Sequence, residues 1–109
     1  MSKIKVDQFE RASRAWTILV ECTQNRQPIT YGQLAERMGI HPRVCRFFLG
    51  LIQDHCKTKN LPPLQSLVVN KKTRIPGEGY RASLRDYHEI QKAQDKVLNY
   101  AWDRIDNPF

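Results

Sequence analysis

The chain has 109 residues, with 18 Lys or Arg against 11 Asp or Glu and a formal net charge of +7. A chain of this length is expected to form one domain, 1–109, and its apolar runs are too short to span a membrane. The first residues lack the apolar stretch of a signal peptide, and three cysteines are an odd number for a disulfide framework. These features predict a soluble protein of a reducing, cytoplasmic compartment.

The positive charge is concentrated in the middle of the sequence. Residues 26–85 contain eleven basic and three acidic side chains, whereas residues 1–25 are nearly neutral and residues 86–109 are net acidic. Such a distribution favours a surface that binds a polyanion. A solvated basic surface without a ligand is the alternative that charge alone leaves open.

An amphipathic helix is expected at residues 8–24, after an N-terminal arm of residues 1–7. Asp7 and Glu10 have the spacing of a capping box. The helix carries apolar or small residues at steps of three and four, namely Phe9, Ala12, Trp16, Leu19, Val20 and Thr23. This spacing places them on one face.

Two further helices are expected at 31–38 and 42–57. Thr30 and Gln33 form a second capping box at the start of the shorter helix, and Gly39 suits the left-handed position just after its end. The third helix begins with a proline, which the first turn tolerates well.

The second half of the chain predicts a small β wing and a last helix. Residues 66–70 read as a short strand, 71–79 as a basic turn, 79–82 as a returning strand and 84–105 as a helix. The predicted fold is mainly α with a small β wing, a winged helix-turn-helix over residues 8–82, followed by a C-terminal helix within 83–109.

The segment from residue 34 to residue 48 has the pattern of a helix-turn-helix. Such a pair needs a small residue midway along its first helix, a turn residue four positions later and apolar residues that hold the second helix in place. Those requirements are met in order by Ala35, Gly39, Ile40, Cys45 and Phe48.

This geometry predicts a surface of the protein that binds double-stranded DNA. Arg43, Arg46 and Phe47 would lie on the outward face of the third helix, toward a groove. The start of the second helix and the tip of the wing would contact phosphates, through Thr30, Tyr31 and Gln33 and through Lys71, Lys72 and Arg74.

Several short motifs occur together in one order: PITYGQLAERMG, HPRVCRFFLG, NLPPL and a turn that ends in GEGY. Over about residues 9–80, the chain resembles the DNA-binding domain of the alkylguanine-DNA alkyltransferases, and most closely their non-enzymatic relatives, the alkyltransferase-like proteins. The resemblance implies that Tyr31 presses on a phosphate beside a lesion and that Arg46 enters the minor groove in place of a rotated base. Pro42 and Gly50 also match the family pattern.

The chain departs from that family where its enzymes carry their chemistry. Enzymes of the family continue from L-P-P-L into Pro-Cys-His-Arg, whereas residues 65–70 here read QSLVVN, without Cys, His or Arg. We therefore expect no alkyl transfer, no catalytic residue, no cofactor and no metal. Phe47, Phe48 and Leu49 are also bulkier than the small residues expected beside that arginine, which counts against insertion of this helix into the minor groove.

The sequence thus predicts a non-catalytic DNA-binding protein, with a regulatory or site-marking role. Recognition of alkylated or flipped bases in DNA repair and a winged-helix protein–protein adaptor are the alternatives. Trp16 and Trp102 are expected in the core or at an interface and Cys45 in the core, while His41 and His88 are expected on the surface. The last helix is expected either to pack on the first or to form an interface with a second copy or a protein partner.

Overall fold

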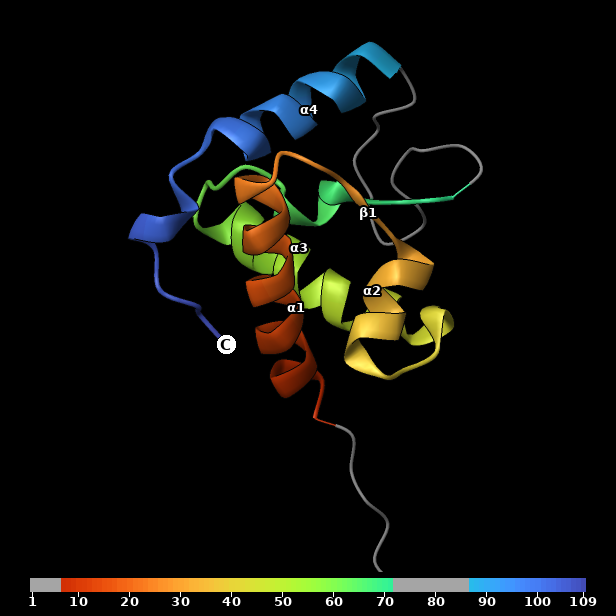
Figure 1. The fold of residues 1–109 in the computed structure, drawn as a ribbon. Coiled ribbons are helices and arrows are strands. Elements are labelled where there is room, and N and C mark those ends of the chain that lie inside the picture. Colours follow the sequence, from red (N-terminus) through yellow and green to blue (C-terminus); the bar gives the residue numbers. More distant parts are fainter. Residues whose placement is uncertain (1–6, 72–86) are drawn as a thin grey trace, which may run out of the picture.

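The computed structural model describes residues 7–71 and 87–109 of the chain. The fold is mainly helical with one two-stranded parallel sheet, so the predicted class, mainly α with a small β part, is confirmed. Figure 1 shows α1 crossing α3, with α2 to one side and α4 across one end. The longer elements are α1 (Gln8–Gln24), α2 (Tyr31–Met38), α3 (Cys45–Thr58) and α4 (Tyr87–Asn99). The short ones are β1 (Ile29–Thr30), η1 (Pro42–Val44), η2 (Leu64–Leu67), β2 (Val68–Val69) and η3 (Trp102–Arg104).

The first three helices begin and end close to the predicted residues. Asp7 caps α1, because its carboxylate accepts hydrogen bonds from the backbone N–H groups of Phe9 and Glu10. The capping box at α2 is complete, since Thr30 and Gln33 each accept a bond from the other's backbone N–H. These side chains satisfy donors that the first turn of a helix cannot pair internally.

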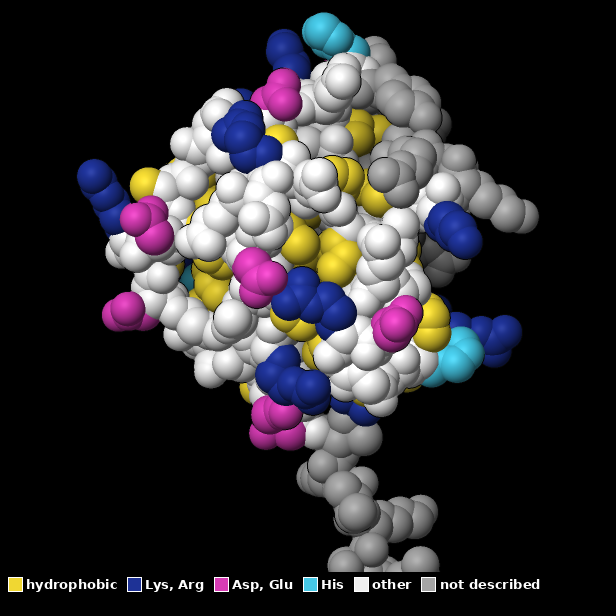
Figure 2. Space-filling view, in the orientation of Figure 1, with side chains coloured by type: hydrophobic (Ala, Val, Ile, Leu, Met, Phe, Trp, Pro, Cys, Tyr) yellow, Lys and Arg dark blue, Asp and Glu magenta, His cyan; other side chains and the backbone are white. Residues whose placement is uncertain are grey.

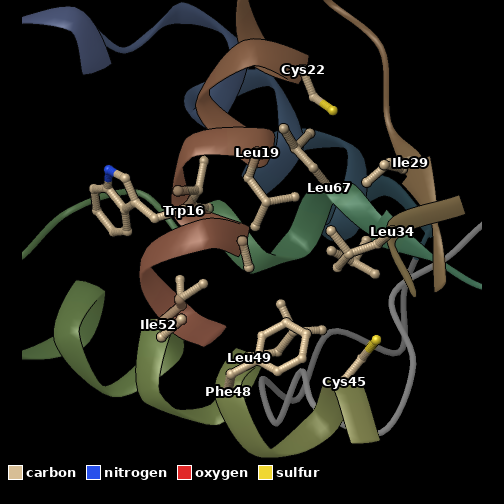
Figure 3. Packing of buried hydrophobic residues seen from close by; sticks show 14 of the residues in the cluster. Trp16, Leu19, Cys22, Ile29, Leu34, Cys45, Phe48, Leu49, Ile52 and Leu67 are labelled. Carbon is tan, nitrogen blue, oxygen red and sulfur yellow. The ribbon is translucent and has the colours of Figure 1, made fainter. Parts of the chain in front are cut away.

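One hydrophobic core joins α1, α3 and η2. Trp16 and Leu19 from α1 meet Phe48 and Ile52 from α3, and Leu67 closes the layer from η2 (Figure 3). All five are at least 98% buried. The core fixes the side of α3 that faces inward and thereby the side that faces solvent.

The predicted strand at 66–70 is shorter than expected. Ser66 and Leu67 belong to the 3-10 helix η2, in which the N–H of Ser66 donates to the carbonyl of Pro63 at 2.9 Å. Only Val68 and Val69 form a strand, and they pair in parallel with β1. The basic loop beyond Lys71 and the returning strand at 79–82 lie outside the described residues.

The prediction of one last helix to residue 105 is wrong at its C-terminal end. α4 ends at Asn99, and the chain turns so that the indole N–H of Trp102 donates to the carbonyl of Val97 at 2.7 Å. Trp102 is 2% exposed, and its ring meets Trp16 edge to face with 5.5 Å between centroids. Burial of this ring against α1 competes with continuation of the helix.

The last residues return along α1, and the C-terminal end lies beside that helix in Figure 1. The side-chain amide of Asn107 donates to the carbonyl of Ser13, and Phe109 meets Trp16 with 6.1 Å between ring centroids. α4 also contacts α1 and η2. The C-terminal segment therefore packs on the first helix, which is one of the two arrangements expected from the sequence.

Candidate nucleic-acid interface

A tight turn connects α2 to α3. Gly39 ends α2 in the left-handed conformation, with φ of +70°, and the N–H of Ile40 donates back to the carbonyl of Ala35 at 3.0 Å. The ring nitrogen Nδ1 of His41 then accepts a hydrogen bond from the N–H of Arg43 at 3.1 Å, at the start of η1. Glycine can adopt the left-handed backbone conformation without a steric penalty. These contacts fix where η1 and α3 begin.

The start of α3 separates two faces. Cys45, Phe48 and Leu49 are buried in the core, each at most 1% exposed, whereas the neighbouring Arg46 and Phe47 face outward. Phe47 is 49% exposed, which is unusual for so large an apolar side chain. The guanidinium carbon of Arg46 lies 5.0 Å from the centre of the Phe47 ring, within the range of a cation–π contact.

Arg43 is also exposed and lies in η1, immediately before α3. The structure therefore brings Arg43, Arg46 and Phe47 together at one solvent-facing end of the α3 segment. This outer end of α3, defined by those three residues, is the candidate interface.

The three residues predicted at the start of α2 have different environments. Thr30 is 7% exposed and its hydroxyl oxygen accepts from Gln33 N–H at 3.1 Å, so this side chain holds the helix end together. Gln33 is exposed but its side-chain oxygen is bonded to Thr30 N–H. Tyr31 is half-buried against the core. The sequence pattern predicts this capping role for Thr30 and Gln33 as well as the phosphate contact.

Of the residues predicted at the wing, the structure describes one. Lys71 is exposed and lies two residues beyond the end of β2. Lys72 and Arg74 lie outside the described residues, so the expected wing contacts stay predictions.

Two other arginines of the middle segment are exposed but make contacts within the protein. The two carboxylate oxygens of Glu21 lie 3.2 and 3.3 Å from one guanidinium nitrogen of Arg37. Arg26 donates to the carbonyl of Leu98 and to the side chain of Asn99, at the end of α4. Both arginines contribute to the positive charge of residues 26–85, but each one contacts another part of the same chain.

Charge on the outer surface is mixed where Figure 2 views it. Lysine and arginine side chains alternate there with aspartate and glutamate, and hydrophobic atoms show between them. The face in that view therefore offers no uniform basic patch, so the local grouping of cations matters more than the net charge.

The three cysteines are buried free thiols. Burial raises the pKa of Cys45 from 9.0 to about 11, opposed by the nearby Arg11 cation. Burial also raises the pKa of Cys56, against a backbone hydrogen bond from Leu64, and that of Cys22, against Arg37. A nucleophilic cysteine needs the opposite shift, because the thiolate is the reactive form.

Residues 65–70 contain no ionisable nucleophile. Gln65 and Ser66 are 4% and 0% exposed, and their side-chain oxygens make no hydrogen bond to the described part of the chain. In residues 7–71 and 87–109 no group of three His, Cys, Asp or Glu side chains is placed to hold a metal ion. His55, next to Cys56, instead packs edge to face between Trp16 and Phe109, with 5.7 Å between ring centroids in each case.

Comparison with known proteins finds no matching family model, no matching curated protein and no matching solved structure. Across the part of the chain that the structure describes, no helix is both long and apolar enough to cross a membrane.

Proposed function

We propose that the chain is a non-catalytic protein that binds double-stranded DNA through the outer end of α3, in the manner of a winged helix-turn-helix. The observation that carries the proposal is the exposure of Arg43, Arg46 and Phe47 at one end of a helix whose opposite face is locked in the core. A helix is about 10–12 Å across and fits the ~12 Å major groove of B-DNA. Two guanidinium groups at its start would contact phosphates or base edges.

Two further features support this function. The α2 segment is short, capped at both ends and followed by a left-handed glycine, as the first helix of a helix-turn-helix requires. Lys71 follows β2 and begins the basic segment that the sequence predicts as a wing. The absence of Cys, His and Arg from residues 65–70 supports a protein without alkyl-transfer chemistry, acting in regulation or in marking a site.

A salt titration tests DNA binding directly. Fluorescence anisotropy on a labelled 20-base-pair duplex should show affinity that falls steeply with salt, with a slope of about −0.9 per phosphate contact in a log–log plot. Arg43→Ala and Arg46→Ala should each weaken binding and reduce the slope by about one unit if the side chain contacts a phosphate. The matched control is Lys92→Ala, an exposed cation on α4. Absence of binding at 50 mM salt would refute the function.

A second duplex distinguishes recognition of altered bases from ordinary binding to intact DNA. Arg46→Ala is compared on intact DNA and on the same duplex with one abasic site. A selective loss on the damaged duplex indicates that the arginine replaces a rotated base. Equal weakening on both indicates ordinary duplex binding with a regulatory or site-marking role.

A further inference from the structure

A concave surface lies at the opposite end of α3 from Arg46. A groove of about 600 Å³ runs between the last turn of α3, the connector after it and the end of α4. Lys57 lies eleven residues beyond Arg46, which corresponds to about 16 Å along the helix axis. The proposed DNA-binding function uses none of the residues that line this groove.

The floor of the groove is apolar and its shape is fixed by the backbone. Asn60 has a φ of +56°, and the N–H of Leu61 donates to the carbonyl of Cys56 at 2.8 Å, so the chain leaves α3 in a closed turn. Pro62 and Pro63 continue the floor beside Leu61. Prolines have no N–H group and a fixed φ, so this surface is rigid and offers no backbone donor for pairing a strand.

The rim of the groove is basic on both sides. Lys57 reaches it from α3 and Lys96 from α4, and both side chains are exposed. Among the described residues that line the groove, none is acidic. Tyr100 is 38% exposed at one end, and its ring packs at a tilt against that of Trp102, with 4.8 Å between centroids, which holds the phenol in place.

We propose that this groove docks an extended acidic segment of a partner protein, with a bulky apolar side chain on the floor and carboxylates on Lys57 and Lys96. The volume suits a few side chains, since small-ligand pockets are typically about 300–1,000 Å³. Positive charges on both sides of an apolar floor select a peptide that carries an apolar residue between acidic ones. A DNA duplex presents phosphates to the two lysines but has no apolar side chain to fill the floor.

The test uses the 109-residue chain without DNA, so it is independent of the proposed DNA binding. The probe is an acetylated eight-residue peptide with a Leu-Phe pair between three glutamates on each side. Titration of the ¹⁵N-labelled protein should shift the amide signals of Lys57, Leu61, Lys96 and Tyr100. The control peptide, with glutamines in place of the glutamates, should bind at least tenfold more weakly.

Two charge-reversal pairs with the same total charge separate this groove from the DNA surface. Lys57→Glu with Lys96→Glu should weaken peptide binding at least tenfold and change affinity for duplex DNA less than threefold at 150 mM salt, where the screening length is about 8 Å. Arg43→Glu with Lys71→Glu should do the reverse. Tyr100→Ala removes the aromatic end without a charge change and should weaken the peptide alone.

Three results would overturn the docking site. One is no signal shift at 1 mM peptide, and another is a set of shifts confined to Arg43, Arg46 and Phe47. The third is a loss of DNA affinity in the Lys57 and Lys96 pair equal to that in the Arg43 and Lys71 pair, which would assign the two lysines to the DNA interface. Circular dichroism of each variant verifies that it is folded.

Discussion

Cys45 shows how one residue couples the core to the candidate interface. It lies at the first turn of α3, wholly buried, directly before the exposed Arg46. The apolar spacing along the helix predicts this burial, because a free cysteine packs as a small hydrophobic residue. The exposed pair that follows it in the sequence is held outward because Cys45 and Phe48 are held inward.

The raised pKa of Cys45 predicts a loss of stability at alkaline pH. The thiol ionises near its ordinary pKa of 9.0 in the unfolded chain but only at about 11 in the folded one. The folded state therefore keeps its full advantage below pH 9 and loses it between pH 9 and 11, by roughly 3 kcal/mol in total. Urea unfolding at a series of pH values, with reductant present, measures this loss.

The matched variant for that measurement is Cys45→Ala, which has no thiol to ionise. The difference in unfolding free energy between the wild type and this variant should shrink steadily from pH 9 to pH 11. A difference that stays constant to pH 10.5 would show that the buried thiol ionises equally in both states.

Phe47 offers a test, at one residue, of whether α3 contacts DNA as proposed. A half-exposed phenylalanine contributes little to the folded core, so Phe47→Ala should change the unfolding free energy by less than about 0.5 kcal/mol. If Phe47 contacts the duplex, affinity should fall about tenfold with no change in the salt slope, because no phosphate contact is lost. Anisotropy at two salt concentrations distinguishes this result from that expected for Arg46→Ala, which should also reduce the salt slope by about one unit.

For the secondary-structure elements, local sequence patterns predict where the helices begin. They do not predict elements that form through contacts between residues far apart in the sequence. The Asp7 cap of α1, the capping box of α2 and the left-handed Gly39 are encoded within four residues, so the sequence predicts α1 and α2 well. The pairing of Ile29 with Val68 joins residues far apart in the sequence, and two-residue strands are too short to show an alternating pattern. The sequence pattern therefore does not predict the parallel sheet.

The capping box of α2 can be tested by removing its hydroxyl. Thr30→Ala deletes the acceptor of Gln33 N–H and should cost about 1 kcal/mol of unfolding free energy. Thr30→Ser keeps that oxygen and should retain most of the stability. Urea unfolding followed by circular dichroism compares them, and equal losses in both variants would assign the effect to packing of the lost methyl group.

Two glycines, Gly39 in the turn between α2 and α3 and Gly32 within α2, have opposite expected effects on stability when replaced by alanine. Gly39 has a φ of +70°, and a methyl group added there would meet no atom within 4 Å, so Gly39→Ala should cost about 1 kcal/mol through backbone strain alone. Gly32 lies in α2 without a positive φ, and Gly32→Ala should stabilise by up to about 1 kcal/mol. Urea unfolding of both variants gives the two values. A neutral Gly39→Ala would show that the turn adopts another conformation without cost.

At the scale of the whole molecule, aromatic side chains connect the two ends of the described chain. Trp16 of α1 meets Trp102 and Phe109, and His55 of α3 packs against both Trp16 and Phe109. The sequence predicts that Trp16 and Trp102 are buried, but their contact depends on how α4 and the turn after it fold back. The apolar spacing of Val97, Ala101 and Ile105 suggests a longer helix. Spacing within this segment carries no information about the contact of Trp102 with the distant ring of Trp16.

The C-terminal segment makes both a buried aromatic contact and an exposed polar one with α1. Trp102→Phe keeps an aromatic ring but removes the indole N–H that donates to Val97, and should cost about 2 kcal/mol because the group is buried. Asn107→Ala removes exposed hydrogen bonds to Ser13 and Thr17 and should cost less than about 0.5 kcal/mol. Urea unfolding monitored by circular dichroism gives both values. If Asn107→Ala proved the costlier change, the polar contacts rather than the aromatic cluster would hold this segment on α1.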